Sequence, residues 1–206
     1  SVNSIGQYAF NDCSNNLATV AFLGNTVNNL GDNAFNDISH DSTLYYISDS
    51  ENRITAWSQF TKKITYSVDT ANNVTLNTFE PKNYAGPFVV LSLIGGNQVT
   101  SIANAFTQCT DITSIHLPDS ITSIADSAFQ ACEELTSINI PDAVTFIGSK
   151  TFDGCIAFTS ITFGINSQLE TIGELAFDGL SIESVFLPKS VKTIGRGAFG
   201  ACKDMK

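Results

Sequence analysis

The chain of 206 residues is 43% hydrophobic and 15% charged, a composition typical of a folded protein and unlike that of a disordered one. Twenty acidic and ten basic side chains give a net charge of −10, and the longest basic run is Lys62–Lys63. Such a surface repels phosphate backbones, so we expect no nucleic-acid partner. No apolar run approaches the ~20 residues that span a bilayer, and the sequence begins without a signal peptide, so we expect no membrane insertion.

A recurring phenylalanine marks the organisation of the chain. Preceded by alanine or threonine, it returns after 25, 71, 23, 23, 25 and 22 residues, and 71 is close to three periods. A period of ~20–50 residues is the signature of stacked structural repeats, so we predict units of about 23 residues. The recurring residues are Phe10, Phe35, Phe106, Phe129, Phe152, Phe177 and Phe199.

The cysteines follow the same period. Each lies three residues after a recurring phenylalanine, and Ile38 and Leu180 fill that place in the other two units. A position that accepts Cys, Ile and Leu is an apolar packing position, so we favour a column of buried thiols with no metal or cofactor. The alternatives are a zinc site, which the lack of a C-x-x-C pair disfavours, and disulfides, which the distance between neighbouring units permits. The cysteines are Cys13, Cys109, Cys132, Cys155 and Cys202.

Each unit contains an extended segment with apolar residues in the pattern L-x-x-I-x-I. The last three of these positions alternate in the way that a strand with one buried face requires. A proline or glycine usually follows, and proline ends a strand because it cannot donate a hydrogen bond to its neighbour. In chain order the segments are Leu17–Leu23, Ile112–Pro118, Leu135–Pro141, Phe158–Gly164 and Ile182–Pro188.

A second, shorter extended segment and a turn complete each unit, as in Val144–Ile147 followed by Gly148–Cys155. The spacing of the apolar residues in the turn suits a single helical or 3₁₀ turn. No unit can bury its apolar side alone, whereas stacked units pair their strands at ~4.8 Å and form continuous apolar columns. The sequence therefore predicts a solenoid.

Two stretches, Leu135–Cys155 and Ile182–Cys202, follow the pattern L-x-x-I-x-I-P-x-x-V-x-x-I-G-x-x-A-F-x-x-C at most of its positions. This pattern resembles that of the BspA-like leucine-rich repeats, and the resemblance covers about 1–35 and 99–202. It implies an α/β, β-rich, right-handed solenoid, with stacked short strands and with short helical or 3₁₀ turns on the convex side. Family members are typically secreted or surface proteins, several with a role in adhesion, so the resemblance implies an extracellular or cell-surface location.

The chain departs from the pattern between Asn36 and Gln98. Ser42–Val68 looks like the segment that often closes a block of such repeats, with a strand, a short helix over Ser50–Phe60 and a last strand. We therefore predict two parts: residues 1–68, the end of a first block with its closing cap, and residues 69–206, a second block truncated within a repeat. The alternative is one continuous solenoid with degenerate central units. Because both ends fall inside a repeat, we expect the chain to be a piece of a longer array.

Catalytic motifs are absent from the sequence, which contains only two histidines and none of the usual nucleophile, phosphate-loop or metalloprotease patterns. We therefore expect no enzymatic activity. Binding needs only a surface, and the x positions of L-x-x-I-x-I form two columns on the outer, concave face of the predicted sheet. The candidate ligand-binding residues are Ser114, Ser137 and Ser160 in one column, and His116, Asn139, Thr162 and Phe186 in the other.

Three functions compete for this surface. We favour a non-catalytic module that binds a protein ligand, such as an extracellular-matrix or plasma glycoprotein, and so mediates adhesion. The uniform serine column instead favours a structural spacer with no ligand of its own. A carbohydrate-binding or enzymatic role would need aromatic platforms or paired carboxylates, and few aromatic residues other than Phe186 are eligible.

Overall fold

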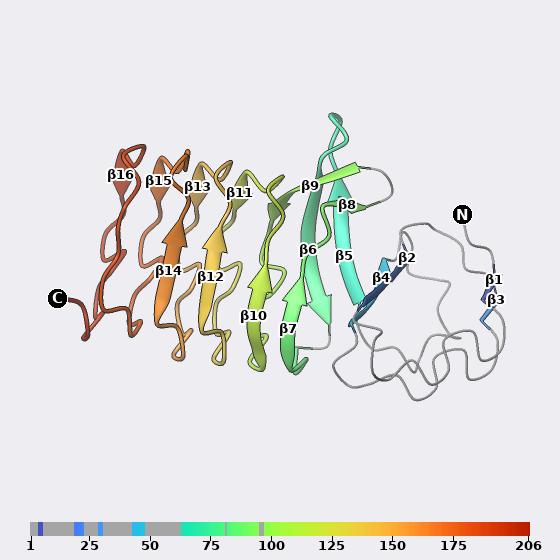
Figure 1. Ribbon diagram of the computed structural model, residues 1–206, viewed down its shortest axis with the longest axis horizontal. Helices are drawn as coiled ribbons and strands as arrows, with labels where there is room; N and C mark the ends of the chain where they lie inside the picture. Colours follow the sequence, from blue (N-terminus) through green and yellow to red (C-terminus); the bar gives the residue numbers. More distant parts are fainter. Residues whose placement is uncertain are drawn as a thin grey trace.

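The structure of the chain is a computed structural model. It describes residues 64–80, 82–94 and 97–206 with their side chains. Ahead of them it gives the backbone of Lys63 and of four short strands: β1 (Ser4–Ile5), β2 (Thr19–Phe22), β3 (Asn29–Leu30) and β4 (Thr43–Ile47). Figure 1 shows the described units stacked in chain order, each as one coil of a solenoid.

Three of the predicted first extended segments and one strand ahead of them form a four-stranded parallel sheet, here called sheet 1. Its strands lie in the order β14 (Ser160–Phe163), β12 (Ser137–Ile140), β10 (Ile112–His116) and β7 (Gly86–Val89). The register places equivalent residues of successive coils side by side, as in Ile115 beside Ile138. This arrangement confirms the prediction that identical units cover one another.

The second extended segment forms short parallel strands in another sheet, here called sheet 2. It contains β9 (Asn97–Ile102), β11 (Ser123–Ile124), β13 (Phe146–Ile147), β15 (Thr171–Ile172) and β16 (Thr193–Ile194). Successive strands of this series pair in parallel, so sheet 2 gains one strand per unit from β9 to β16.

Beyond β9, sheet 2 continues through strands that the repeat pattern does not describe. β6 (Val74–Glu80) pairs in parallel with β9 and antiparallel with β5 (Lys63–Val68), and β5 pairs with β4, which pairs with β2. β8 (Leu93–Ile94) folds back on β9, and β1 pairs with β3 in a separate two-stranded sheet. The strands β4 and β5 lie where the sequence predicts them, whereas the predicted helix over Ser50–Phe60 lies outside the described residues. The division into two blocks at residue 68 stays a prediction.

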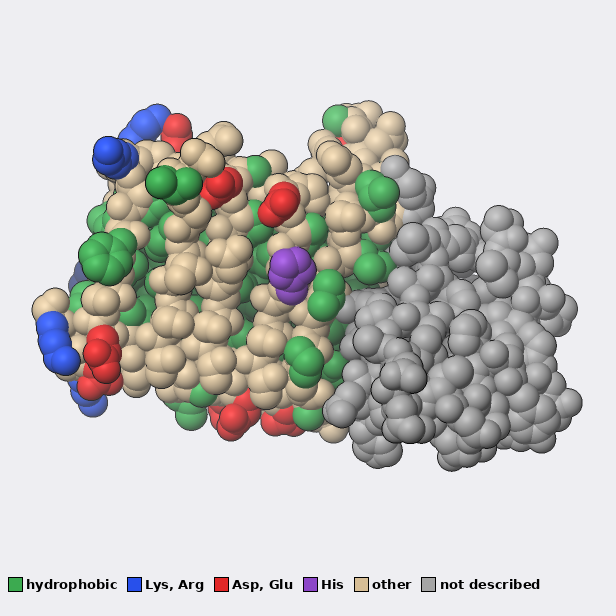
Figure 2. All heavy atoms as spheres, viewed as in Figure 1, with side chains coloured by type: hydrophobic (Ala, Val, Ile, Leu, Met, Phe, Trp, Pro, Cys, Tyr) green, Lys and Arg blue, Asp and Glu red, His purple; other side chains and the backbone are tan. Residues whose placement is uncertain are grey.

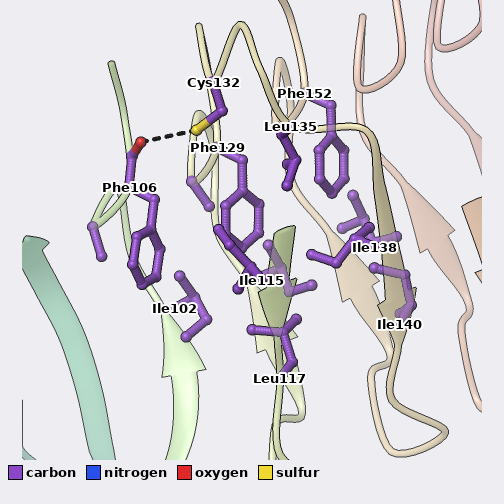
Figure 3. Packing of buried hydrophobic residues seen from close by; sticks show 14 of the residues in the cluster. Ile102, Phe106, Ile115, Leu117, Phe129, Cys132, Leu135, Ile138, Ile140 and Phe152 are labelled. Carbon is purple, nitrogen blue, oxygen red and sulfur yellow. Dashed lines mark hydrogen bonds between the residues drawn. The ribbon is translucent and has the colours of Figure 1, made fainter. Parts of the chain in front are cut away.

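The core lies between the two sheets and the turns, and it consists of the predicted columns. Phe129 is fully buried, and its ring stacks between those of Phe106 and Phe152, with centroids 5.6 and 5.3 Å away (Figure 3). Phe177 and Phe199 continue this stack at centroid distances of 5.1 Å. A ring that the pattern missed, Phe79, extends the column beyond Phe106 at 5.5 Å. We call this column the phenylalanine ladder.

The prediction of helical or 3₁₀ turns is not supported, because no helix forms among the described residues. In the turn of Phe129, alternate amides bond in different directions. The N–H groups of Ser127, Phe129 and Ala131 donate to the next coil, whereas that of Cys132 donates back to the Phe129 carbonyl within the turn. Ser127 and Ala131 adopt a φ of 57°, which a right-handed helix does not allow. The turns therefore stack by hydrogen bonds between coils, as the strands do.

The predicted strand over Ile182–Pro188 is also wrong, since no strand forms there and sheet 1 ends at β14. In the other coils two residues separate the column of cysteines from the strand segment, such as Glu133 and Glu134. After Leu180 only Ser181 precedes the buried Ile182. The connection is thus one residue shorter in this coil, and the residues after Ile182 do not pair with β14 as a strand.

Candidate functional site

The candidate binding residues lie mainly on the outer face of sheet 1, the face that points away from the core. Strands β10 and β12 alternate there as predicted: Ile115 and Ile138 are buried, whereas His116 and Asn139 are exposed. In Figure 2 this face is mostly tan, with little charge and a single histidine on it. The alternation follows from the period of two residues along a strand.

The register of sheet 1 brings the predicted columns together. Ser114 lies beside Ser137, and Ser137 lies beside Ser160, so the serine column is continuous over three strands. Asn139 lies beside Thr162, whose hydroxyl donates a hydrogen bond of 3.2 Å to the Asn139 Oδ1. Polar ladders of this kind hold neighbouring strands in register and leave side-chain groups free for a partner.

Phe186 and the extended segment Leu17–Leu23 lie outside sheet 1. Phe186 follows the last strand of sheet 1 and is 89% exposed, so no described coil covers its ring. The sequence analysis places Leu17–Leu23 in the same series as β10, but β2 instead pairs with β4 in the extension of sheet 2. The structure therefore groups six of the seven candidates on one sheet and leaves the seventh beside it.

In the described part of the chain, the column of cysteines lies in the turns, with each cysteine three residues after a phenylalanine of the ladder. Cys109, Cys132 and Cys155 are buried free thiols, and Cys202 is half-buried. The Cys132 thiol donates a hydrogen bond of 3.1 Å to the Phe106 carbonyl of the preceding coil (Figure 3), and Cys155 does the same to Phe129. These bonds satisfy carbonyls inside the core.

Two of the buried thiols, those of Cys109 and Cys132, have a raised pKa. Desolvation raises the pKa of Cys109 to about 12, and a hydrogen bond with Cys155 together with burial raises the pKa of Cys132. The thiolate is the form that acts as nucleophile or metal ligand, so these two cysteines stay unreactive at neutral pH. The arrangement favours a packing role for the column.

Charge is distributed unevenly along the stack. Residues 101–181 carry ten acidic side chains and one lysine, whereas residues 182–206 carry five basic and two acidic side chains. Figure 2 shows lysines and arginines gathered at the C-terminal end of the solenoid. A search for consecutive basic residues does not reveal this segregation, because the basic residues near the C-terminus are separated from one another in the sequence. Two ion pairs involve these basic residues in the described part of the chain: Lys192 with Glu170 of the preceding coil at 2.6 Å, and Lys206 with Glu183 at 3.8 Å.

Within the described ranges, no group of three or more His, Cys, Asp or Glu side chains converges as a metal site would require. The same part of the chain contains no helix long and apolar enough for a membrane span. The candidate site is thus an extended polar face of sheet 1 that lies over a regularly packed core.

Known proteins share this repeat. A family model described as the BspA type leucine rich repeat region matches in six copies, over residues 1–85 and 89–206. The match includes much of the segment between residues 36 and 98 in which the sequence departs from the pattern. None of the curated proteins compared with the chain matches it.

Solved structures show the same fold. A leucine-rich repeat protein from Bacteroides ovatus is 32% identical with a TM-score of 0.62, and the match covers 69% of this chain and 38% of that protein. The pneumococcal vaccine antigen PcpA is 23% identical with a TM-score of 0.51, over 69% of this chain and 46% of the antigen. The chain therefore spans less than half the length of either relative.

Proposed function

Because this chain belongs to the BspA-type leucine-rich repeat family, we propose that it is a non-catalytic protein-binding module of a secreted or cell-surface protein. In this proposal the stacked coils form a rigid scaffold, and the outer face of sheet 1 holds a protein ligand. The ligand is a host or cell-surface protein, such as an extracellular-matrix or plasma glycoprotein, so the module mediates adhesion. Repeat proteins commonly bind their partners across extended surfaces of this kind.

One observation carries the proposal: the outer face of sheet 1 presents exposed, chemically varied side chains in register on adjacent strands. His116, Asn139 and Thr162 offer an imidazole, an amide and a hydroxyl along successive strands. The exposed ring of Phe186 in the following coil adds an apolar contact, and aromatic residues are frequent anchors of protein interfaces. A varied set of this type can discriminate between ligands.

The serine column supports a second function. Ser114, Ser137 and Ser160 repeat one side chain on three adjacent strands, so that column carries no information that distinguishes one ligand from another. A face composed of such columns suits a structural spacer that only projects other parts of a surface protein.

The two functions are separated by equilibrium binding of the purified chain to immobilised fibronectin and fibrinogen. We expect saturable binding that weakens about tenfold or more in the His116→Ala/Phe186→Ala variant, since loss of an interface anchor typically costs ~2 kcal/mol. The matched control is Thr145→Ala/Phe146→Ala. It also removes two exposed side chains, but from β13 of sheet 2 and from the residue directly before that strand. If no protein binds while circular dichroism shows a folded chain, the spacer function replaces the adhesive one.

A further inference from the structure

The regular stack is interrupted where β14 ends. In the two preceding coils the strand segment ends in a Pro-Asp pair, Pro118–Asp119 and Pro141–Asp142. In the coil of β14, Gly164 takes the place of the proline, and the connection to the next buried residue, Leu169, is two residues longer. The longer connection turns outward into solvent, where Ile165 is 100% exposed.

This interruption leaves a hollow of about 440 Å³ at the end of β12. Two carboxylates and two amides contribute to its lining, from Asp119, Asp142, Asn139 and Gln168, and no lysine or arginine does. Pro141 and Ala143, together with Ile140, add apolar surface. The hollow therefore combines negative charge with an apolar wall.

Asp142 has an unusual environment within this hollow. Its Oδ1 is buried and has no hydrogen-bond partner among the described residues. The carboxylate packs against Gly164 so closely that a Cβ at residue 164 would overlap it. Oδ1 lies against Gly164, so a ligand in the hollow meets this carboxylate through Oδ2, where a positively charged N–H donor forms a charge-assisted hydrogen bond.

We propose that the hollow binds the primary ammonium group of a lysine side chain presented by the protein ligand. This inference rests on the proposed function and names the chemistry of one contact. Because Oδ1 is shielded, the ammonium group reaches the Asp142 carboxylate through Oδ2, and Asp119 adds a second negative charge. A lysine also carries a four-carbon apolar stem, which matches the wall formed by Pro141 and Ala143.

Two features favour this occupant over others. A divalent cation needs more oxygen ligands than these two carboxylates supply, and no described group of three acidic or histidine side chains converges. Asn139 belongs both to the outer face of sheet 1 and to the lining of the hollow, so a protein bound on that face can extend a side chain into it.

The test titrates the ¹⁵N-labelled chain with n-butylammonium chloride, which mimics the end of a lysine side chain. We expect saturable changes in the amide chemical shifts of Gly164 and Gln168, and none with n-butanol or with equal sodium chloride. The isosteric Asp142→Asn variant is expected to weaken butylammonium binding about tenfold, because a charge-assisted hydrogen bond is roughly twice as strong as a neutral one and that difference corresponds to about a factor of ten in affinity. Asp119→Asn provides a second variant in case the first fails to fold.

The matched control is Glu134→Gln, which removes one negative charge from an exposed position outside the hollow. It should leave butylammonium binding unchanged, and Asp142→Asn should keep or raise the thermal midpoint because it removes an unpaired buried charge. Equal shifts with butanol, no saturable shifts, or equal loss in Glu134→Gln would overturn the inference. The butylammonium titration needs no protein ligand, so absence of butylammonium binding does not contradict the proposed function. Likewise, absence of fibronectin and fibrinogen binding does not affect the butylammonium titration.

Discussion

Phe129→Ala is expected to destabilise the chain by ~3–5 kcal/mol, the range for a fully buried phenylalanine that leaves a cavity. Phe129 is 0% exposed and lies in the middle of the phenylalanine ladder, with its ring 13° from the planes of both Phe106 and Phe152. Each such ring pair adds ~0.5–1.5 kcal/mol beyond the burial of area. The substitution therefore removes the free energy gained by burying the ring, the contacts with two neighbouring rings, and the packing between two neighbouring coils.

Urea unfolding followed by circular dichroism measures this effect. The matched control is Phe146→Ala, because Phe146 is 37% exposed on sheet 2 and lies outside the core. It should cost less than about 1 kcal/mol, as substitutions away from the core generally do. Equal unfolding midpoints for the two variants would contradict the ladder as the main support of the stack.

Gly173→Ala is expected to destabilise the chain by ~1–3 kcal/mol through overpacking. A Cβ at residue 173 would lie 2.5 Å from the Gly148 carbonyl carbon and 2.5 Å from the Ser149 nitrogen, both backbone atoms of the preceding coil. Backbone held in a stack cannot move aside as a flexible side chain can, so the two coils must separate. Their separation weakens the bond between the Gly173 N–H and the Ile147 carbonyl, now 2.8 Å long.

Gly179→Ala serves as the comparison, because it makes the same chemical change at a site with open space. Nothing lies within 4 Å of a Cβ at residue 179, although φ there is +73°. Ala131 and Ala201 occupy the equivalent place in other coils with a φ of 57° and 48°, so alanine is tolerated at a cost of about 1 kcal/mol or less. Thermal unfolding should therefore rank Gly173→Ala well below Gly179→Ala in stability. The reverse order would mean that the close approach of the two coils does not determine the cost of a side chain at residue 173.

The core could be predicted from the sequence because each apolar column repeats one position. The period aligns Phe106, Phe129 and Phe152 and places a cysteine three residues after each of them, and all six of these residues are buried. Alternation within L-x-x-I-x-I likewise predicted that His116 and Asn139 face outward. These inferences succeeded because burial in a stack depends on spacing alone.

The departures depend on backbone geometry that spacing does not encode. The spacing of the apolar residues in each turn predicted a single helical or 3₁₀ turn. Instead, Ser127 and Ala131 adopt a positive φ, and alternate backbone N–H groups of the turn donate to the next coil. One missing residue before Ile182 removed a predicted strand. Two additional residues after Gly164 opened a hollow at Asp142, and the lengths of these connections were visible in the sequence without revealing their consequence.

In the proposed function, the outer face of sheet 1 binds the protein ligand. The most direct test compares fibronectin and fibrinogen binding by Thr162→Arg and by Thr145→Arg. Both threonines are exposed; Thr162 lies on the outer face of sheet 1, and Thr145 directly precedes a strand of sheet 2. We expect Thr162→Arg to abolish binding and Thr145→Arg to retain it, because a bulky charge on the binding face prevents close contact. Equal binding by the two variants, or loss only in Thr145→Arg, would show that the ligand does not bind this face.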